Sequence, residues 1–302
     1  MISHENKYAA FIMTYKRVDI LPDTILQLMS QTLPPSKILI VDNDPEESAA
    51  VVAGNFKDRN VSYFPVGYNS GPAGAAFYGL KILFEEQWEW VLWMDDNDPP
   101  QFPDVIEKLF TIPGRYRQTE KIGMLGAVGV KFDTKRAKTL RLPDESLCGI
   151  LEVDNVGGGY SPMINRRVYQ KGIMPDKNLF FGFEELDFSL AIKRAGFVVL
   201  ISGEEIYRHR QKAGRLNFKR KLYAVKSIKS LWREFYSVRN VVYILKFKEK
   251  ATIGLCSLLL KVVGKSLIGY RWGWKYGVTN MKYLLGGYYN GWIGRMGKKS
   301  FE

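Results

Sequence analysis

A short apolar run that stops at a cluster of carboxylates constrains this chain more than any other stretch. Residues 91–94 read Val-Leu-Trp-Met, and Asp95, Asp96 and Asp98 follow before two prolines. This pattern predicts a buried strand that ends by presenting carboxylates at one edge of a sheet. Neighbouring carboxylates repel one another, and divalent ions that take oxygen ligands offset that cost, so the cluster predicts a site for a metal and a diphosphate. A solvated acidic turn stands as an equal alternative, because Asp, Asn and Pro are common turn residues.

The residues before this cluster alternate between strand and helix patterns. The pattern predicts strands 8–14, 37–41 and 61–65 and helices 18–30 and 46–56. Strands alternating with helices at these lengths indicate right-handed crossover units and therefore an α/β fold with a mostly parallel sheet. Ligands bind outside the carboxyl ends of the strands in such sheets, so we expect Thr14, Asp42 and Asp95 to gather at one edge.

A glycine-rich turn, residues 69–74, opens a helix that runs to about residue 86. Asn69 or Ser70 suits its N-cap, Pro72 suits its first turn, and the glycines permit close approach of backbone to a ligand. The free amides at the start of such a helix bind phosphate in many proteins. A plain capped helix is the alternative, because the turn matches neither the dinucleotide fingerprint nor a P-loop.

The alternation continues beyond the carboxylates, with one stretch that has no clear pattern. The pattern predicts helix 102–110, strand 122–130, helix 164–172, strand 197–201 and helix 219–246. Residues 131–156 receive no assignment. Gly157, Gly158 and Gly159 form either a flexible linker or a loop that folds closely over a substrate.

A second acidic cluster, Glu184, Glu185 and Asp187, begins a helix that ends near residues 194–196. Acidic residues in a first helical turn are favoured by the helix dipole, which is the structural interpretation. The functional interpretation is a general base whose pKa is raised by desolvation among the neighbouring aromatic residues. Downstream, His209 lies among cationic residues and is either an ordinary surface histidine or a third metal ligand.

Charge and cysteine content narrow the classes of partner and location. The net charge of +13 favours acidic partners, namely nucleoside diphosphates, nucleic acid or an anionic membrane face. Cys148 and Cys256 have no nearby metal-ligating residue, which argues against a disulfide framework and favours the cytosol. No signal peptide is recognised at the N-terminus. The longest apolar run is interrupted by Lys261 and Lys265, well short of the roughly 20 residues that span a bilayer, so no transmembrane helix is expected.

The last fifty residues combine basic and aromatic side chains. Residues 251–302 interleave tryptophans and tyrosines with lysines and arginines. This combination suits the interface of an anionic membrane, where rings sit at headgroup depth and cations attract lipid. A packed helical hairpin with a charged outer face is the alternative. We therefore divide the chain into a domain of residues 1–215 and a helical region of residues 216–302 that associates with an acceptor or a membrane.

In this order, the motifs resemble family-2 glycosyltransferases with the GT-A fold, the group that includes bacterial galactofuranosyl- and rhamnosyltransferases. The motifs are residues 14–17, 41–44, 68–74, 93–98, 183–188 and 235–240, and residues 291–298 resemble the tail of that subgroup. The resemblance implies an inverting sugar transfer from a nucleoside diphosphate donor. It implies that Thr14, Arg17 and Asp42 hold the nucleotide and that Asn69 and Gly71 line the donor site.

The resemblance also implies a divalent metal, Mn²⁺ or Mg²⁺. The Asp-x-Asp motif of the family fits Asp96 and Asp98, with Asp95 as the alternative partner because Asn97 replaces the usual third aspartate. In the galactofuranosyl branch a histidine also binds the metal, and His209 is its counterpart.

The catalytic base of the family corresponds to Glu185, with Asp187 and Glu184 as alternatives. Arg239 and Asn240 match a further motif of that branch, but the sequence assigns them no role.

The implied reaction belongs to surface polysaccharide assembly at the cytoplasmic side, peripheral on the inner membrane face. UDP-galactofuranose is the first expected donor, with dTDP-rhamnose as the alternative, and the acceptor is a glycan or a lipid-linked glycan. A nucleotidyltransferase uses a similar sheet with carboxylates and a metal, and it remains a competing class. A nucleic-acid-binding protein is disfavoured, because two acidic clusters repel a phosphate backbone. The sequence does not fix the oligomeric state.

Overall fold

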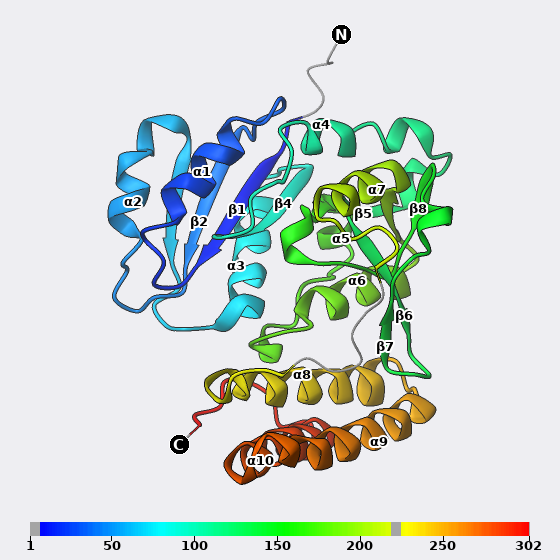
Figure 1. Cartoon of the computed structure of the whole chain (residues 1–302). Helices are drawn as coiled ribbons and strands as arrows, with labels where there is room; N and C mark the ends of the chain where they lie inside the picture. The colour runs from blue at the N-terminus through cyan, green and yellow to red at the C-terminus, as the bar shows by residue number, and fades with distance from the viewer. Residues whose placement is uncertain (1–6, 219–224, 302) are drawn as a thin grey trace. The chain divides into compact units, whose positions relative to one another are not determined.

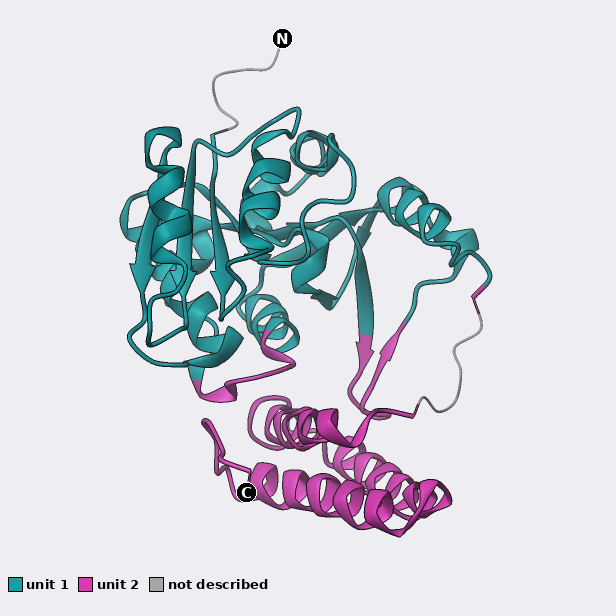
Figure 2. Cartoon of the chain, turned by 60° about the vertical axis from the view of Figure 1, so that its left-hand side comes forward, with its two compact units in different colours: residues 1–131, 141–177, 185–217 teal, residues 132–140, 178–184, 218–302 magenta. Residues whose placement is uncertain are grey.

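The computed structural model describes residues 7–218 and 225–301, which fold into two compact units (Figures 1 and 2). The first unit comprises the chain up to residue 131 together with 141–177 and 185–217. The second comprises residues 132–140 and 178–184 and the chain from 218 onward. The sequence suggested one boundary after residue 215. The second unit also takes in two inserted segments that no sequence pattern marked.

An eight-stranded sheet in the order β3-β2-β1-β4-β10-β5-β11-β8 forms the centre of the first unit. Its strands are β1 (Ala9–Thr14), β2 (Lys37–Asp42), β3 (Val61–Pro65), β4 (Trp90–Asp95), β5 (Ile122–Gly126), β8 (Ile150–Glu152), β10 (Met163–Asn165) and β11 (Val198–Ser202). Strands β3, β2, β1 and β4 run parallel to their neighbours, and β5 runs parallel to β11. Strands β10 and β8 are antiparallel to the strands they pair with. The predicted mostly parallel α/β sheet is confirmed.

Alternate residues of the buried strands pack against helices on opposite faces of this sheet (Figure 1). Ala10 and Ile12 face a cluster that includes α1 (Leu21–Met29), α2 (Ala50–Asn55) and α4 (Val105–Leu109). The other face is covered by α3 (Gly71–Glu85), α5 (Arg166–Gln170) and α6 (Glu184–Arg194), and Ile206 of α7 (Gly203–Lys212) joins the same cluster. Strands covered on both faces read as continuous apolar runs, which explains why the sequence located them well.

Two predicted elements of the first unit are wrong in detail. The single strand expected at 122–130 is two strands, because the chain leaves the main sheet after Gly126 and begins β6 (Gly129–Asp133) in a small sheet with β7 (Lys138–Leu140) and β9 (Asn155–Val156). The helix expected at 164–172 begins as β10, and α5 starts only where the Asn165 side chain accepts the Arg167 amide at 3.0 Å. Short apolar runs do not distinguish strand from helix by periodicity.

The remaining turns of 3₁₀ helix in the first unit are short connectors. They are η1 (Lys57–Arg59), η2 (Pro113–Arg115), η3 (Thr119–Lys121), η4 (Asp144–Ser146), η5 (Gly158–Tyr160) and η6 (Lys177–Leu179), whose last two residues belong to the second unit. Helix α7 has no counterpart among the predicted elements.

The second unit is built mainly from three helices. They are α8 (Trp232–Tyr243), which continues as the π-helical turn η8 (Ile244–Lys248), α9 (Thr252–Ile268), which continues as η9 (Gly269–Trp272), and α10 (Trp274–Trp292). Of the helix predicted at 219–246, residues 219–224 lie outside the described residues, η7 (Ile228–Ser230) is a 3₁₀ turn, and α8 begins only at Trp232. Helix α10 packs very closely on α8, since a Cβ on Gly287 or Gly291 would lie 2.5 or 2.4 Å from a carbonyl oxygen of α8.

Within the described part of the chain, one helical stretch is long and apolar enough to cross a membrane by length and composition. It covers residues Thr252–Trp272, and 33% of its most apolar part is buried. Lys261 and Lys265 interrupt the apolar run but lie inside a continuous helix, so the expectation that no helix crosses a membrane stays a prediction.

Candidate functional site

The carboxyl edge of the parallel strands brings the predicted nucleotide-binding residues together. Strand pairing places Thr14 opposite Asp42, and Met13 opposite Asp95. The expected gathering of Thr14, Asp42 and Asp95 at one edge is therefore confirmed, because parallel strands end on the same side of their sheet.

The carboxylate of Asp96 is bound by the last residue of β1 and by a residue of the loop that follows it. Thr14 Oγ1 donates to Asp96 Oδ2 at 2.8 Å, and Arg17 Nη1 donates to Oδ1 at 3.0 Å. Thr24 Oγ1 also donates to the Asp96 carbonyl oxygen at 2.5 Å. Burial raises the pKa of Asp96, and the bonds from Thr14 and Arg17 oppose that rise. Asp96 thus fixes the loop after β1, with both carboxylate oxygens engaged.

Asp42 is buried and shapes the loop after β2. Its oxygens accept hydrogen bonds from the amides of Asp44 at 2.8 Å and Ala49 at 3.0 Å, and from the Tyr63 hydroxyl at 3.0 Å. Burial raises the pKa of Tyr63, and the hydrogen bond to Asp42 adds to the effect. The suggestion that Asp42 binds a nucleotide base stays a prediction.

Asn43, which the sequence analysis did not single out, ties β2 to the start of α3. Its Nδ2 donates to the Gly71 carbonyl at 3.1 Å, and its Oδ1 accepts from the Ser70 hydroxyl at 2.6 Å. Asn69 Oδ1 accepts the Gly71 amide at 3.0 Å, so Asn69 supplies the side-chain bond at this helix start. The sequence feature that could have pointed to Asn43 is its position as a polar residue immediately after a buried strand.

Three carboxylates from two segments of the chain converge on the glycine turn that contains Gly158 and Gly159. The Gly158 amide donates to Glu185 Oε1 at 3.2 Å. A Cβ on Gly158 would lie 3.2 Å from both Asp95 Oδ2 and Glu185 Oε1, and a Cβ on Gly159 would lie 3.0 Å from Asp98 Oδ2. The glycines therefore let bare backbone approach the acidic groups, which argues against a mere linker.

The electrostatics of this cluster favour binding of a cation. Burial, followed by the negative charges of Glu185, Asp98 and Asp96, raises the pKa of Asp95 to about 7. Burial also raises the pKa of Glu185. Oxygen ligands with excess negative charge are what Mg²⁺ and Mn²⁺ require, so Asp95 and Asp98 fit a metal. Within residues 7–218 and 225–301, no three acidic, histidine or cysteine side chains are already arranged to hold one.

The other two acids of the second cluster, Glu184 and Asp187, are both buried. They lie three residues apart at the start of α6 and so share a face of that helix, whereas Glu185 is rotated by about 100° from Glu184 around the helix axis. Glu185 contacts the glycine turn through its Oε1. This geometry favours Glu185 among the three predicted bases.

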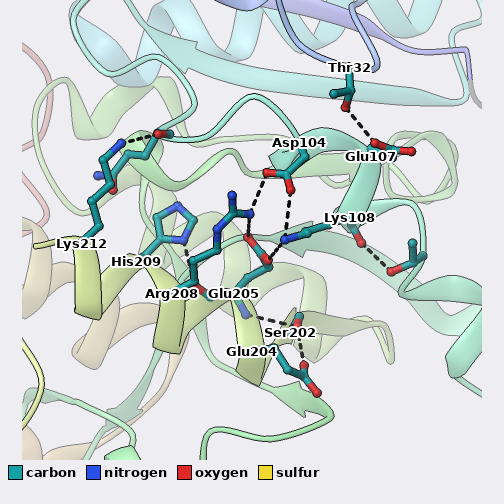
Figure 3. Close-up of polar contacts among 12 residues, drawn as sticks. Thr32, Asp104, Glu107, Lys108, Ser202, Glu204, Glu205, Arg208, His209 and Lys212 are labelled. Atoms are coloured by element: carbon teal, nitrogen blue, oxygen red, sulfur yellow. Dashed lines mark hydrogen bonds and ion pairs between the residues drawn. The ribbon is translucent and has the colours of Figure 1, made fainter.

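His209 is buried in α7, so the expectation of a surface histidine is wrong (Figure 3). Its Nδ1 lies 2.8 Å from the Glu205 carbonyl oxygen. Because a carbonyl only accepts, Nδ1 carries the proton and the neutral ring keeps the lone pair on Nε2. Burial lowers the pKa of His209, which favours this neutral form. Metal-binding histidines commonly have such a bond on the other nitrogen, so the predicted ligand role is chemically consistent.

An ion-pair network joins α7, the helix that carries His209, to the segment around α4 (Figure 3). Arg208 lies 2.7 Å from Asp104 and 3.6 Å from Glu205, and Lys108 lies 3.1 and 2.9 Å from the same two carboxylates. The Arg208 guanidinium also stacks 3.8 Å from the ring centre of Phe102. These contacts fix the position of α7 against the segment around α4.

In the second unit, Arg239 and Asn240 clamp the loop at residues 179–182. Asn240 Nδ2 donates to the carbonyls of Leu179 at 3.0 Å, Phe181 at 3.0 Å and Gly182 at 2.6 Å. Arg239 Nη2 donates to Leu179 at 2.7 Å and its Nε to Asn240 Oδ1 at 3.0 Å. Along the chain this loop leads directly into α6.

The clamped loop has an unusual backbone. Phe180, Gly182 and Phe183 have φ values of 60°, 80° and 68°, in the left-handed region that disfavours side chains. Hydrogen bonds to its carbonyls therefore stabilise a conformation that the loop would not keep alone. Arg239 and Asn240, to which the sequence assigned no role, therefore position this loop.

Two comparisons with known proteins gave a match. Residues 9–141 match the family model described as Glycosyl transferase family 2, a range that includes Thr14, Asp42 and the Asp95–Asp98 cluster. No curated protein matches the chain. The fold is similar to the solved structure of GalNAc-T7 with UDP, GalNAc and Mn²⁺, with a TM-score of 0.54 and 11% identity over 92% of this chain and 54% of that chain.

This chain thus spans about half the length of that neighbour, 54%, and the likeness concerns the fold. The family match and the fold lead to the same coarse assignment. Residues 9–141, somewhat less than half of the chain, thus resemble glycosyl transferase family 2, and the fold is GT-A-like.

Proposed function

We propose that this chain is an inverting, metal-dependent glycosyltransferase that moves a sugar from a nucleoside diphosphate donor to an acceptor hydroxyl. The observation that carries the proposal is the convergence of Asp95, Asp98 and Glu185 on the glycine turn at residues 158–159. Ligands of such sheets bind at this edge.

Asp95 and Asp98 would hold Mn²⁺ or Mg²⁺, with His209 Nε2 as a further ligand. When bound, the metal supplies positive charge for the departing diphosphate. Thr14 and Arg17, positioned through Asp96, line the same edge and would bind the nucleotide, together with Asp42.

Glu185 is the proposed base. Burial raises its pKa, which strengthens the carboxylate as a proton acceptor, and the Gly158 amide orients that carboxylate through Oε1. The acceptor hydroxyl gives its proton to Glu185 while its oxygen attacks the anomeric carbon. The bond from that carbon to the diphosphate breaks, and a nucleoside diphosphate leaves with the bonding electron pair.

We propose first a class of donors and then a particular sugar within it. The neighbour GalNAc-T7 was solved with UDP and Mn²⁺, which supports testing UDP-sugars first. Within that class UDP-galactofuranose is the first proposal and dTDP-rhamnose the alternative, from the resemblance of the motifs.

The reaction product tests the proposal and separates it from a nucleotidyltransferase. The purified chain is incubated with Mn²⁺, a panel of nucleotide sugars and simple alkyl glycosides as acceptors, and the released nucleotide is analysed. We expect release of a nucleoside diphosphate that is lost in Glu185→Gln and kept in Glu120→Gln, an exposed glutamate. Release of pyrophosphate would instead indicate nucleotidyl transfer.

We also propose that the second unit places the enzyme on an anionic membrane face from the cytoplasmic side. Between Glu249 and Glu302 the sequence has nine Lys or Arg residues and no Asp or Glu. Ile253, Leu260 and Leu267 lie seven residues apart on α9 and are largely exposed. Residues at this spacing share one side of a helix, so α9 presents an apolar stripe within a cationic segment.

Vesicle co-sedimentation tests this placement. Leu260→Glu with Leu267→Glu should release the chain from vesicles rich in phosphatidylglycerol, whereas Val51→Glu, at an exposed apolar site on α2, should not. Equal retention of all three proteins would refute the membrane role of α9.

A further inference from the structure

A cavity of about 530 Å³ lies entirely within the second unit. Its walls come from the segment 132–140, which forms the tip of the β6–β7 hairpin, and from α8, α9 and α10. This volume is within the range of small-molecule sites. The apolar part of the lining consists of buried side chains, among them Leu231, Val238, Leu258, Val262 and Tyr276.

The polar part of the lining is dominated by lysines. Four of them line the cavity with a single acid, Glu234; they are Lys138, Lys226, Lys261 and Lys265. Glu234 forms an ion pair with Lys226 and lies 3.8 Å from Lys265. One carboxylate therefore faces four cations, and the lining keeps an excess of positive charge.

Lys261 shows the effect of this excess. Its Nζ donates to the carbonyls of Arg136 and Ala137 in the hairpin. Burial and then the charge of Lys138 lower the pKa of Lys261, with Lys265 adding to the effect and Asp133 opposing it. Repulsion among these cations is relieved when an anion binds between them.

The two parts of the lining select a ligand with two chemical ends. A lysine rim binds phosphate as a set of point charges, while buried aliphatic side chains give a phosphate ion no favourable contact. An apolar chain without a charge would leave the lysines uncompensated. A ligand that satisfies both parts carries phosphate at one end and hydrocarbon at the other.

We propose that this cavity binds an alkyl or isoprenyl phosphate, with the phosphate at Lys138 and Lys265 and the hydrocarbon chain against Val238 and Val262. Taking this ligand as the lipid phosphate of a lipid-linked acceptor rests on the proposed function. The cavity then holds the acceptor by its lipid end, separately from the donor site of the first unit.

Calorimetric titration of the full chain with octyl phosphate, in the absence of vesicles, tests the proposal. We expect binding that is about tenfold weaker in Lys138→Gln/Lys265→Gln, since charge-assisted contacts to phosphate are lost. The matched control, Lys275→Gln/Lys282→Gln, removes two exposed charges of α10 outside the cavity and should leave binding unchanged. Val238→Phe fills the apolar part and should also weaken binding.

Four results would overturn the proposal. Equal affinity for inorganic phosphate would show that the apolar side chains contribute nothing to binding. Equal affinity for 1-octanol would show that the lysines contribute nothing. Equal losses in the control pair would indicate a diffuse charge effect. Failure of the wild-type chain to bind octyl phosphate would end the proposal outright.

Two further measurements distinguish ligand binding in this cavity from membrane binding and from donor binding. Vesicle binding should fall no further in Lys138→Gln/Lys265→Gln than in Lys275→Gln/Lys282→Gln, which also removes two charges, and a selectively larger loss would assign the cavity to bulk lipid headgroups, against the proposal. The same variant should keep Mn²⁺-dependent UDP binding, and Glu185→Gln should keep octyl phosphate binding. Failure of the donor chemistry with octyl phosphate binding intact would refute the proposed function and leave the cavity assignment standing.

Discussion

Replacing Asn240 by alanine tests whether the clamp holds the loop that leads into α6. The Asn240 side chain is fully buried and donates to three carbonyls, those of Leu179, Phe181 and Gly182. Leu179 keeps a second donor in Arg239. The substitution therefore leaves the carbonyls of Phe181 and Gly182 without this donor. Each loss lowers the free energy of unfolding by roughly 1–3 kcal/mol, or about 2–6 kcal/mol in all.

The expected loss is large compared with the stability of a small unit. A loss of ~1 kcal/mol lowers the Tm of a domain of 60–100 residues by roughly 4–8 °C, so Asn240→Ala should lower the Tm of the second unit by about 10 °C or more. Hydrogen exchange should quicken at residues 178–184 first, because their backbone conformation depends on the clamp. Transfer activity should fall as well, since the loop runs directly into the helix that carries Glu185.

Asn290→Ala is the matched control for this change. Asn290 lies in the same unit and donates only to the Gly286 carbonyl at 2.8 Å, within its own helix. We expect a loss below ~1 kcal/mol there, because that carbonyl belongs to a regular helical ladder. Equal losses in the two variants, or unchanged exchange at 178–184 in Asn240→Ala, would refute the clamp.

The remaining predictions concern the acidic cluster. Glu185→Gln should lower the transfer rate roughly 10²–10⁴-fold while donor binding, measured by calorimetry, stays intact. The pKa of Asp95 is raised from 3.8 to about 7, so between these pH values the folded state holds a proton that the unfolded state has lost. Stability of the metal-free protein should therefore fall as pH rises from about 4 to about 7, by at most about 4 kcal/mol, and Asp95→Asn should flatten the profile measured by urea unfolding in chelator. Gly159→Ala places a Cβ 3.0 Å from Asp98 Oδ2 and should weaken Mn²⁺-dependent UDP binding about tenfold, whereas Gly114→Ala, with nothing within 4 Å, should not.

The sequence predicted the first half of the fold well for a simple reason. Strands β1, β2 and β4 are buried on both faces, so their apolar runs and polar ends are visible without any knowledge of tertiary contacts. Parallel pairing then places Thr14, Asp42 and Asp95 at one edge. The run at 164–172 was assigned wrongly, because the short apolar pair at residues 163–164 fits a strand or a helix equally.

Which contacts each carboxylate makes depends on residues that are distant in the sequence. Whether Asp95 or Asp96 faces the glycine turn is decided by Arg17 and Thr14, which bind Asp96, and by Gly158, which lies against Asp95. No local pattern contains that information. The clamp of Asn240 on residues 179–182 likewise joins segments about sixty residues apart, so the sequence showed the motif but not its role.

The central claim is that Asp95 and Asp98 hold the metal and diphosphate of a nucleotide-sugar donor, with Glu185 beside them as the base. The most direct test is calorimetric titration of UDP into the wild-type chain and into Asp95→Asn, with Mn²⁺ and with chelator. We expect UDP to bind only with Mn²⁺ and Asp95→Asn to lose that binding while keeping its fold by circular dichroism. Binding of UDP that is indifferent to Mn²⁺, or unchanged in Asp95→Asn, would contradict the account and move the donor site away from this cluster.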